Sequence, residues 1–172
     1  MTAVPGGTFV ISLVGLGITS AQVTGFFIDL TEVTNAAYKE FVDAKGYENA
    51  EFWKVPIVVE GEEKTLVQAL GIFTDLTGRP GPAGWELGDF PAAQANFPVT
   101  GVSWYEAQAY AEFRHKKLPT LYHWVMASSG PFPPHDPIAP YLLPYSNFSS
   151  EAIAAVGQYP GLARDILSQD RD

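Results

Sequence analysis

The stretch PVTGVSWYEA at residues 98–107 carries the strongest local signal in the sequence. Residues 98–102 are rich in β-branched side chains and predict a short strand. Ser103 and Glu106 stand three positions apart, which is the spacing of a capping box at the start of a helix. We expect this helix to continue to about Lys116. The side chains expected on its buried face are those of Ala107, Tyr110, Ala111 and Phe113.

Short segments of both secondary-structure types surround this centre. A turn at residues 5–7 and strands over 8–11 and 26–30 are expected from the glycines and from the β-branched and aromatic runs. Three more helices are predicted. The first is capped by Thr34 or Asn35, buries Tyr38, Phe41 and Val42 and stops at Gly46. The second lies near residues 66–73. The third is capped by Thr120 and covers residues 121–128.

The mixture of elements predicts an α+β fold with little regular secondary structure. Glycine and proline together contribute 30 residues (16 and 14), so much of the chain is expected to be loop. No internal repeat and no change of composition divides the sequence. We therefore expect residues 1–172 to form a single domain, a size that suits one hydrophobic core.

Composition excludes several classes of function. Nineteen acidic residues oppose ten Lys and Arg, giving a formal charge of −9, so nucleic acids and anionic membrane surfaces are poor partners. Hydrophobic residues make up 47% of the chain, which excludes intrinsic disorder. The apolar run at residues 10–18 is too short to span a bilayer, and the first basic residue is Lys39, too late for a signal peptide. A cytoplasmic location is expected.

The chain contains no cysteine, so its own residues cannot form a disulfide or a thiolate metal site. Its three histidines, His115, His123 and His135, show no compact metal-binding spacing, so we interpret them as surface or structural residues and keep a metal site as the alternative.

The four tryptophans divide into two pairs. Trp104 and Trp124 fall in predicted helices and are interpreted as core residues. Trp53 and Trp85 fall in predicted loops, where a role in binding is more plausible. Glu86 follows Trp85 in a segment rich in glycine and proline. We therefore predict that Trp53, Trp85 and Glu86 contribute to a ligand-contacting loop.

Five motifs, taken in order, resemble one known family. They are VPGGTF at residues 4–9, FIDLTEVTN at 27–35, PVTGVSWYEA at 98–107, KLPT at 117–120, and Trp124. Together they resemble the formylglycine-generating enzyme, or sulfatase-modifying factor, family. The resemblance covers residues 4 to about 128. It implies a decorated C-type-lectin-like fold, in agreement with the composition.

The departures from the family pattern shape the functional prediction. The resemblance implies an enzyme that oxidises a substrate cysteine with copper held by two cysteines, and this chain has none. It also lacks the later Gly-Asn-Val-Trp-Glu-Trp and Arg-Gly-Gly-Ser-Trp segments of the pattern. We therefore expect a truncated version of the fold and assign no catalytic or cofactor-binding residue.

Two further details come from the resemblance. The family's Leu-Pro-Thr-Glu-x-Glu-Trp reads LPTLYHW at residues 118–124, which predicts the loss of a capping box. The family's calcium sites begin at an asparagine that corresponds to Asn147, so the resemblance also implies a calcium site at this residue.

The insertion at residues 52–86 is similar to a bacterial subgroup in which the domain is fused behind a Ser/Thr protein kinase. This similarity implies a non-catalytic binding or accessory module of a larger signalling protein, with a covalently linked kinase domain as partner and an unknown protein or small-molecule ligand. The alternative is a nonheme iron or copper oxidoreductase of the same wider family, acting on a protein or a small molecule. Its candidate ligands are His115, His123 and His135.

Overall fold

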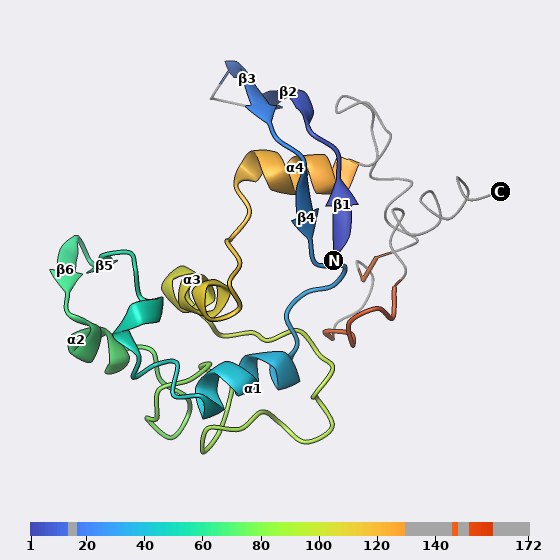
Figure 1. Ribbon diagram of the computed structural model, residues 1–172. Coiled ribbons are helices and arrows are strands. Elements are labelled where there is room, and N and C mark those ends of the chain that lie inside the picture. The colour runs from blue at the N-terminus through green and yellow to red at the C-terminus, as the bar shows by residue number, and fades with distance from the viewer. Residues whose placement is uncertain (14–16, 130–145, 148–151, 160–172) are drawn as a thin grey trace. The chain divides into compact units, whose positions relative to one another are not determined.

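The computed structural model describes residues 1–13, 17–129, 146–147 and 152–159. Helices and small antiparallel sheets are both present, which confirms the predicted α+β class (Figure 1). The chain divides into two compact units, and each is described by itself. The hairpin unit comprises Met1–Thr31, Pro119–Ile153 and Gly157–Asp172, and the aromatic unit comprises Glu32–Leu118 and Ala154–Val156.

Four strands form the antiparallel part of the hairpin unit: β1 (Thr2–Val4), β2 (Gly7–Leu13), β3 (Gly17–Val23) and β4 (Phe26–Ile28). Strand β1 pairs with β4, and β2 pairs with β3.

The two pairs share one register. Val4 lies opposite Phe26 and Gly7 lies opposite Val23, so the register continues across the interruption between them. The turn predicted at residues 5–7 is therefore wrong, because the chain keeps its direction there. A Cβ atom at Gly6 would lie 2.6 Å from the backbone nitrogen of Gly25, so the backbones approach too closely for a side chain.

Helix α4 (Leu121–Ser129) lies against β2 and β3 in the same unit and confirms the predicted helix. Its first turn contains an unexpected capping arrangement. Thr120 Oγ1 accepts from the His123 amide at 3.4 Å, while the Thr120 amide donates to His123 Nδ1 at 3.3 Å. The predicted loss of the capping box is therefore wrong, because an imidazole nitrogen accepts the bond that a glutamate would accept. The His123 ring also meets Phe26 edge-on at 4.7 Å.

The aromatic unit begins with α1 (Asn35–Asp43), capped by Thr34, whose hydroxyl accepts from the Ala37 amide at 3.1 Å. The helix ends in a Schellman motif, since the Gly46 amide donates to the carbonyl of Phe41 at 2.8 Å. The left-handed residue of that motif is Lys45, with φ 58°, rather than the predicted Gly46. Gly46 is required for space instead, because a Cβ there would lie 2.0 Å from the Phe41 ring.

Short elements connect α1 to the central helix. They are a 3-10 turn at Ala50–Phe52, strands β5 (Ile57–Val59) and β6 (Glu62–Lys64), and α2 (Leu66–Leu70), which confirms the helix predicted near residues 66–73. The hydroxyl of Tyr105 accepts from the Val58 amide at 3.0 Å and donates to the Val58 carbonyl at 3.2 Å. These two bonds connect the β5–β6 hairpin to the first turn of the helix that begins at Trp104.

Helix α3 (Trp104–Phe113) begins as predicted, with a complete capping box, but it ends at Phe113 rather than near Lys116. The Glu106 amide donates to Ser103 Oγ at 3.3 Å, and the Ser103 amide donates to Glu106 Oε2 at 2.6 Å. The segment before it does not form the predicted strand, because only an isolated bridge joins Pro98 to Thr34. Pro98 has no amide to donate, and Gly101 has φ 73°, which no strand residue adopts.

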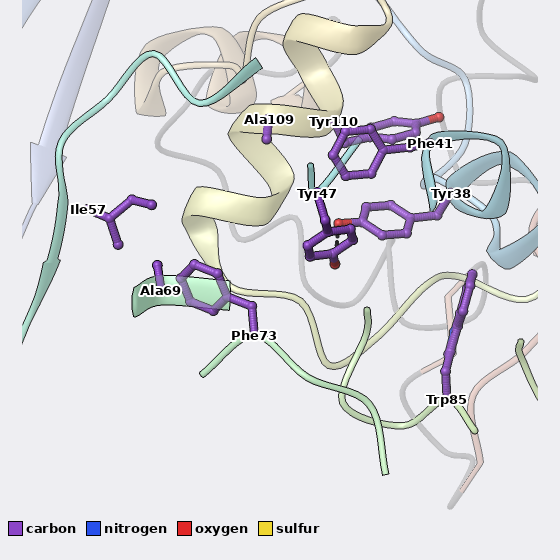
Figure 2. Packing of buried hydrophobic residues seen from close by; sticks show 9 residues of the cluster. All are labelled: Tyr38, Phe41, Tyr47, Ile57, Ala69, Phe73, Trp85, Ala109 and Tyr110. Carbon is purple, nitrogen blue, oxygen red and sulfur yellow. Dashed lines mark hydrogen bonds between the residues drawn. The ribbon is translucent and has the colours of Figure 1, made fainter. Parts of the chain in front are cut away.

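Aromatic side chains from α1, α3 and the intervening loops fill the core of the aromatic unit. Figure 2 shows nine of its buried residues: Tyr38, Phe41, Tyr47, Ile57, Ala69, Phe73, Trp85, Ala109 and Tyr110. Tyr110 stacks on Tyr38 with ring centroids 5.1 Å apart. The core interpretation is wrong for the two helical tryptophans, since Trp104 is 56% exposed on the aromatic unit and Trp124 is 60% exposed on the hairpin unit.

Candidate functional site

The loop at residues 74–89 of the aromatic unit is organised by one buried carboxylate. Asp75 Oδ1 accepts from the amides of Thr77 and Arg79 at 2.8 and 3.0 Å and from the Thr77 hydroxyl at 2.7 Å. Asp75 Oδ2 accepts from the Gly88 amide at 2.8 Å, on the opposite side of the loop. Burial favours the neutral acid, but the bonds from Thr77, Gly88 and Arg79 outweigh it and lower the pKa of Asp75 from 3.8.

The bond to Gly88 is one of several that hold a strained turn. Glu86 and Asp89 exchange two backbone hydrogen bonds, at 2.9 and 3.0 Å, around Leu87 and Gly88. Both central residues have positive φ, 56° for Leu87 and 76° for Gly88, as a type I′ turn requires. Glycine adopts this conformation freely, whereas leucine does so at a steric cost.

Side chains of residues 75–79 compensate for that strain. The Leu87 amide donates to Thr77 Oγ1 at 3.2 Å, and Arg79 Nη1 donates to the Leu87 carbonyl at 3.1 Å. With the Asp75–Gly88 bond, three side chains therefore fix the backbone of the turn. Neither the strained leucine nor the role of Asp75 was predicted. A signal for the role of Asp75 was present in the sequence TDLTGR at residues 74–79, where an aspartate stands two positions before a threonine and three before a glycine.

The three residues predicted for a ligand-contacting loop lie in different environments. Trp85 is only 2% exposed, and its indole nitrogen donates to Asn35 Oδ1 at 3.1 Å. Trp53 is half-buried, stacks on Phe73 with centroids 5.9 Å apart, and donates from its indole nitrogen to the Gly46 carbonyl at 3.0 Å. Glu86 is exposed, one residue before the strained Leu87.

Of this set, only Glu86 is exposed. Trp53 and Trp85 pack within the aromatic unit, where each indole nitrogen has a hydrogen-bond acceptor. Their contact with a ligand stays a prediction.

A second polar arrangement lies inside the aromatic core. Tyr47 donates to Glu106 Oε1 at 2.6 Å, and the hydroxyls of Tyr38 and Tyr47 lie 3.1 Å apart. Because the single hydroxyl proton of Tyr47 goes to Glu106, Tyr38 is the donor to Tyr47. Burial, the neighbouring hydroxyl and the Glu106 charge raise the pKa of Tyr47 above its ordinary value, and burial raises that of Tyr38. Both hydroxyls stay protonated chiefly because they are buried, and the bonds between them satisfy polar groups inside the core.

The two histidines that the structure describes, His115 and His123, belong to different units. His115 is exposed in the aromatic unit, at the left-handed position (φ 54°) that ends α3. His123 belongs to the hairpin unit, where Thr120 uses its Nδ1. His135 lies outside the described residues. Within the described ranges, no group of three or more His, Asp or Glu side chains is placed to hold a metal ion.

Asn147, the predicted calcium residue, has one unsatisfied atom. Its Nδ2 donates to the Ala152 carbonyl at 2.8 Å. Its Oδ1 is buried and accepts no hydrogen bond from the part of the chain that the structure describes. A buried, unpaired amide oxygen is costly unless a donor or a cation meets it, so the donor chemistry of this atom fits Ca²⁺.

No helix among the described residues combines the length and the apolar character needed to cross a membrane.

Comparison with known proteins shows which family this chain resembles. The family model described as "Sulfatase-modifying factor enzyme 1-like domain" matches residues 1–151. The chain is 33% identical to mouse formylglycine-generating enzyme over 63% of its length, and 27% identical to hercynine oxygenase of Mycolicibacterium smegmatis over 94%. It is 30% identical to the serine/threonine-protein kinase Pkn1 of Chlamydia trachomatis over 67% of its length. The matches cover 32%, 37% and 16% of these three relatives.

Proposed function

Because the chain belongs to the sulfatase-modifying factor enzyme 1-like family, we propose that it is a C-type-lectin-like, non-catalytic binding or accessory module of a larger bacterial signalling protein. The single observation that carries this proposal is the absence of cysteine from all 172 residues. The copper chemistry implied by the resemblance to formylglycine-generating enzymes needs two thiolate ligands, and no other side chain supplies a thiolate.

A direct assay tests whether this chain catalyses the family reaction. The purified protein is incubated with Cu⁺ and a peptide containing Cys-x-Pro-x-Arg, and the peptide mass is followed for conversion of cysteine to formylglycine. No conversion is expected, while a cysteine-containing family enzyme run in parallel converts the peptide. Formation of the aldehyde by this chain would refute the proposal.

The match to Pkn1 supports the second part of the proposal, a covalently linked Ser/Thr kinase domain. A cytoplasmic location is part of the same proposal. Only 16% of Pkn1 is covered by the match, which is the relation expected between a domain and a larger protein. Sequencing the coding region around this segment tests the link. We expect the same reading frame to encode a kinase domain, and a frame without one contradicts the proposed partner.

A nonheme iron or copper oxidoreductase is the second candidate, and one observation favours it. Of the three relatives compared above, hercynine oxygenase matches the largest share of this chain, 94%. His115, His123 and His135 are the candidate ligands. Metal analysis after reconstitution with Fe²⁺ or Cu²⁺ distinguishes the candidates. Stoichiometric metal that is lost in a His123→Ala variant favours the oxidoreductase, and the absence of bound metal favours the accessory module.

We also propose calcium as a structural ligand at Asn147. The support is the buried Oδ1 without a hydrogen-bond donor, together with the family resemblance. Ca²⁺ is expected to raise the melting temperature of the wild type and of the control variant Asn49→Ala, but not of Asn147→Ala. Equal responses of all three variants, or a wild type that does not respond, would contradict this site.

A further inference from the structure

The buried Tyr47 hydroxyl lies between a hydrogen-bond donor and a base. It donates to Glu106 Oε1 at 2.6 Å, and it accepts from the Tyr38 hydroxyl, whose oxygen lies 3.1 Å away (Figure 2). Each of these three residues is at most 3% exposed, so water does not compete for the bonds. Burial raises the pKa of Tyr47, so the hydroxyl keeps its proton until an electron is removed.

Removal of an electron changes the acidity of this hydroxyl. A neutral phenol is a weak acid, whereas its one-electron-oxidised form is a strong acid that gives up its proton at once. Glu106 Oε1 is the acceptor already in place, and Oε2 keeps its bond from the Ser103 amide. The Tyr38 hydroxyl continues to donate to the oxygen of the resulting tyrosyl radical. Tyr47 can therefore be oxidised without placing a positive charge in the core.

Trp53 connects Tyr47 to the surface of the aromatic unit. Its side chain is half-buried, and its ring centroid lies 5.7 Å from that of Tyr47. At this separation an electron passes directly between the two rings. The indole nitrogen of Trp53 donates to the Gly46 carbonyl at 3.0 Å, and a carbonyl is too weak a base to take the proton of an oxidised indole. An electron vacancy on Trp53 is therefore expected to move to Tyr47, where a carboxylate accepts the proton.

We propose that Tyr47, with Glu106 as its proton acceptor, is a reversible one-electron donor that is oxidised through Trp53. The substrate is a one-electron oxidant at the protein surface, a radical that becomes an anion when it gains the electron. Trp53 loses an electron to this radical and regains one from Tyr47, while the Tyr47 O–H bond breaks and an O–H bond forms on Glu106.

The step leaves the anion, a tyrosyl radical at Tyr47 and a protonated Glu106. A one-electron reductant of the ascorbate type reverses it, because the electron returns to Tyr47 and the proton returns from Glu106. This inference goes beyond the proposed function, since it depends on neither a ligand nor a linked kinase.

Pulse radiolysis of the full chain tests the proposal, with the azide radical as the oxidant. This radical takes an electron from tryptophan and becomes azide. Tryptophanyl and tyrosyl radicals absorb at different wavelengths, so the decay of one and the growth of the other are followed in one sample. We expect wild type to convert tryptophanyl into tyrosyl radical in a phase whose rate does not depend on protein concentration. The phase is expected to be slower in D₂O, because a proton moves with the electron.

Four variants assign this phase to residues. Tyr47→Phe removes the phenol and is expected to lose the phase. Trp53→Phe keeps an aromatic ring against Phe73 and is also expected to lose it. Glu106→Gln keeps an oxygen acceptor but not a base, so we expect a slower phase. The matched control is Trp104→Phe, which removes a tryptophan that is 56% exposed in the same unit and is expected to leave the phase unchanged.

Circular dichroism checks that each variant is folded. If Tyr47→Phe does not fold, Glu106→Gln and the D₂O comparison on wild type carry the test. The proposal is overturned if wild type forms no tyrosyl radical, or if the rate is the same in D₂O as in water. It is also overturned if a folded Tyr47→Phe or Glu106→Gln variant shows the wild-type phase, or if Trp104→Phe loses the phase as completely as Trp53→Phe.

Discussion

Replacing Glu106 with alanine tests the connection between the start of α3 and the aromatic core. The Glu106 carboxylate accepts at one oxygen from the Ser103 amide at 2.6 Å and at the other from the buried Tyr47 hydroxyl at 2.6 Å. The side chain is only 3% exposed, so water cannot readily replace it. Glu106→Ala therefore removes a helix cap and leaves a buried hydroxyl without its acceptor.

The expected cost follows from these two losses. Loss of the capping interaction costs about 1 kcal/mol, and the unsatisfied Tyr47 hydroxyl costs about 1–3 kcal/mol. We expect the free energy of unfolding to fall by about 2–4 kcal/mol in Glu106→Ala. For a chain of this length, that corresponds to a decrease in melting temperature of roughly 4–16 °C.

A double-mutant cycle separates the two contributions. Ser103→Ala removes the reciprocal bond of the capping box and is expected to cost about 1 kcal/mol. Tyr47→Phe removes the donor to Glu106. The double variant Glu106→Ala/Tyr47→Phe should cost less than the sum of its single variants by about 1–2 kcal/mol, because one mutation has already broken the shared bond.

Urea unfolding provides the measurement. It is followed by circular dichroism and by the fluorescence of the tryptophans, among them the buried Trp85. The reasoning would be refuted if Glu106→Ala cost no more than Ser103→Ala and showed no coupling to Tyr47. Glu106 would then serve only as a helix cap.

Three further perturbations test other parts of the structure. The pKa of Asp75 is lowered from 3.8, so its contribution to stability is complete well above that pH and is lost as the pH falls below 3.8; urea titrations at several pH values should show a steeper acid loss in wild type than in Asp75→Asn. Gly46→Ala places a Cβ 2.0 Å from the packed Phe41 ring and should cost about 1–3 kcal/mol in thermal unfolding, whereas Lys45→Gly, beside it, should be neutral or stabilising; equal effects would contradict the packing argument. His123→Ala removes a helix cap and a ring contact and should cost about 1–3 kcal/mol, and an unchanged melting temperature would show that neither forms.

The helices could be predicted because their signals are local. The capping pair at Ser103 and Glu106, the apolar spacing in α1 and the cap at Thr120 each involve residues within one turn of one another. Their bounds follow from side chains that satisfy the backbone groups at the helix ends. Tertiary contacts were not needed to find them.

The burial of the tryptophans could not be predicted, because it depends on distant partners. Trp85 lies in a loop and reads as accessible, yet Asn35, fifty residues earlier, receives its indole hydrogen. Trp124 lies in a helix and was interpreted as a core residue, but the neighbouring residue His123, not Trp124, makes the ring contact with Phe26. Successive helix residues point about 100° apart, so composition cannot decide which of the two faces inward.

The same limit applies to the candidate site. The Asp75 carboxylate joins two segments thirteen residues apart, and the strain at Leu87 is visible only in the backbone angle. An aspartate followed by threonine and glycine predicts a turn at these residues. It does not predict that the aspartate will also hydrogen-bond to a second turn further along the chain.

The residues that carry the family resemblance also explain why resemblance leaves function open. In the stretch at residues 98–107, Gly101 has φ 73°, and a Cβ there would lie 3.0 Å from the Ala83 amide nitrogen, so the position requires glycine. Ser103 and Glu106 cap α3, and Glu106 also accepts from Tyr47 in the core. Each of these roles is structural.

A sequence match that rests on such structural residues reports a shared fold, and it does so whatever reaction the matched protein catalyses. This explains how one chain matches a formylglycine-generating enzyme, an oxygenase and a kinase at comparable identity. Function must then be tested in roles other than capping and packing. In the described structure, the loop at residues 74–89 contains a leucine with φ 56°, a backbone conformation that costs leucine more than glycine.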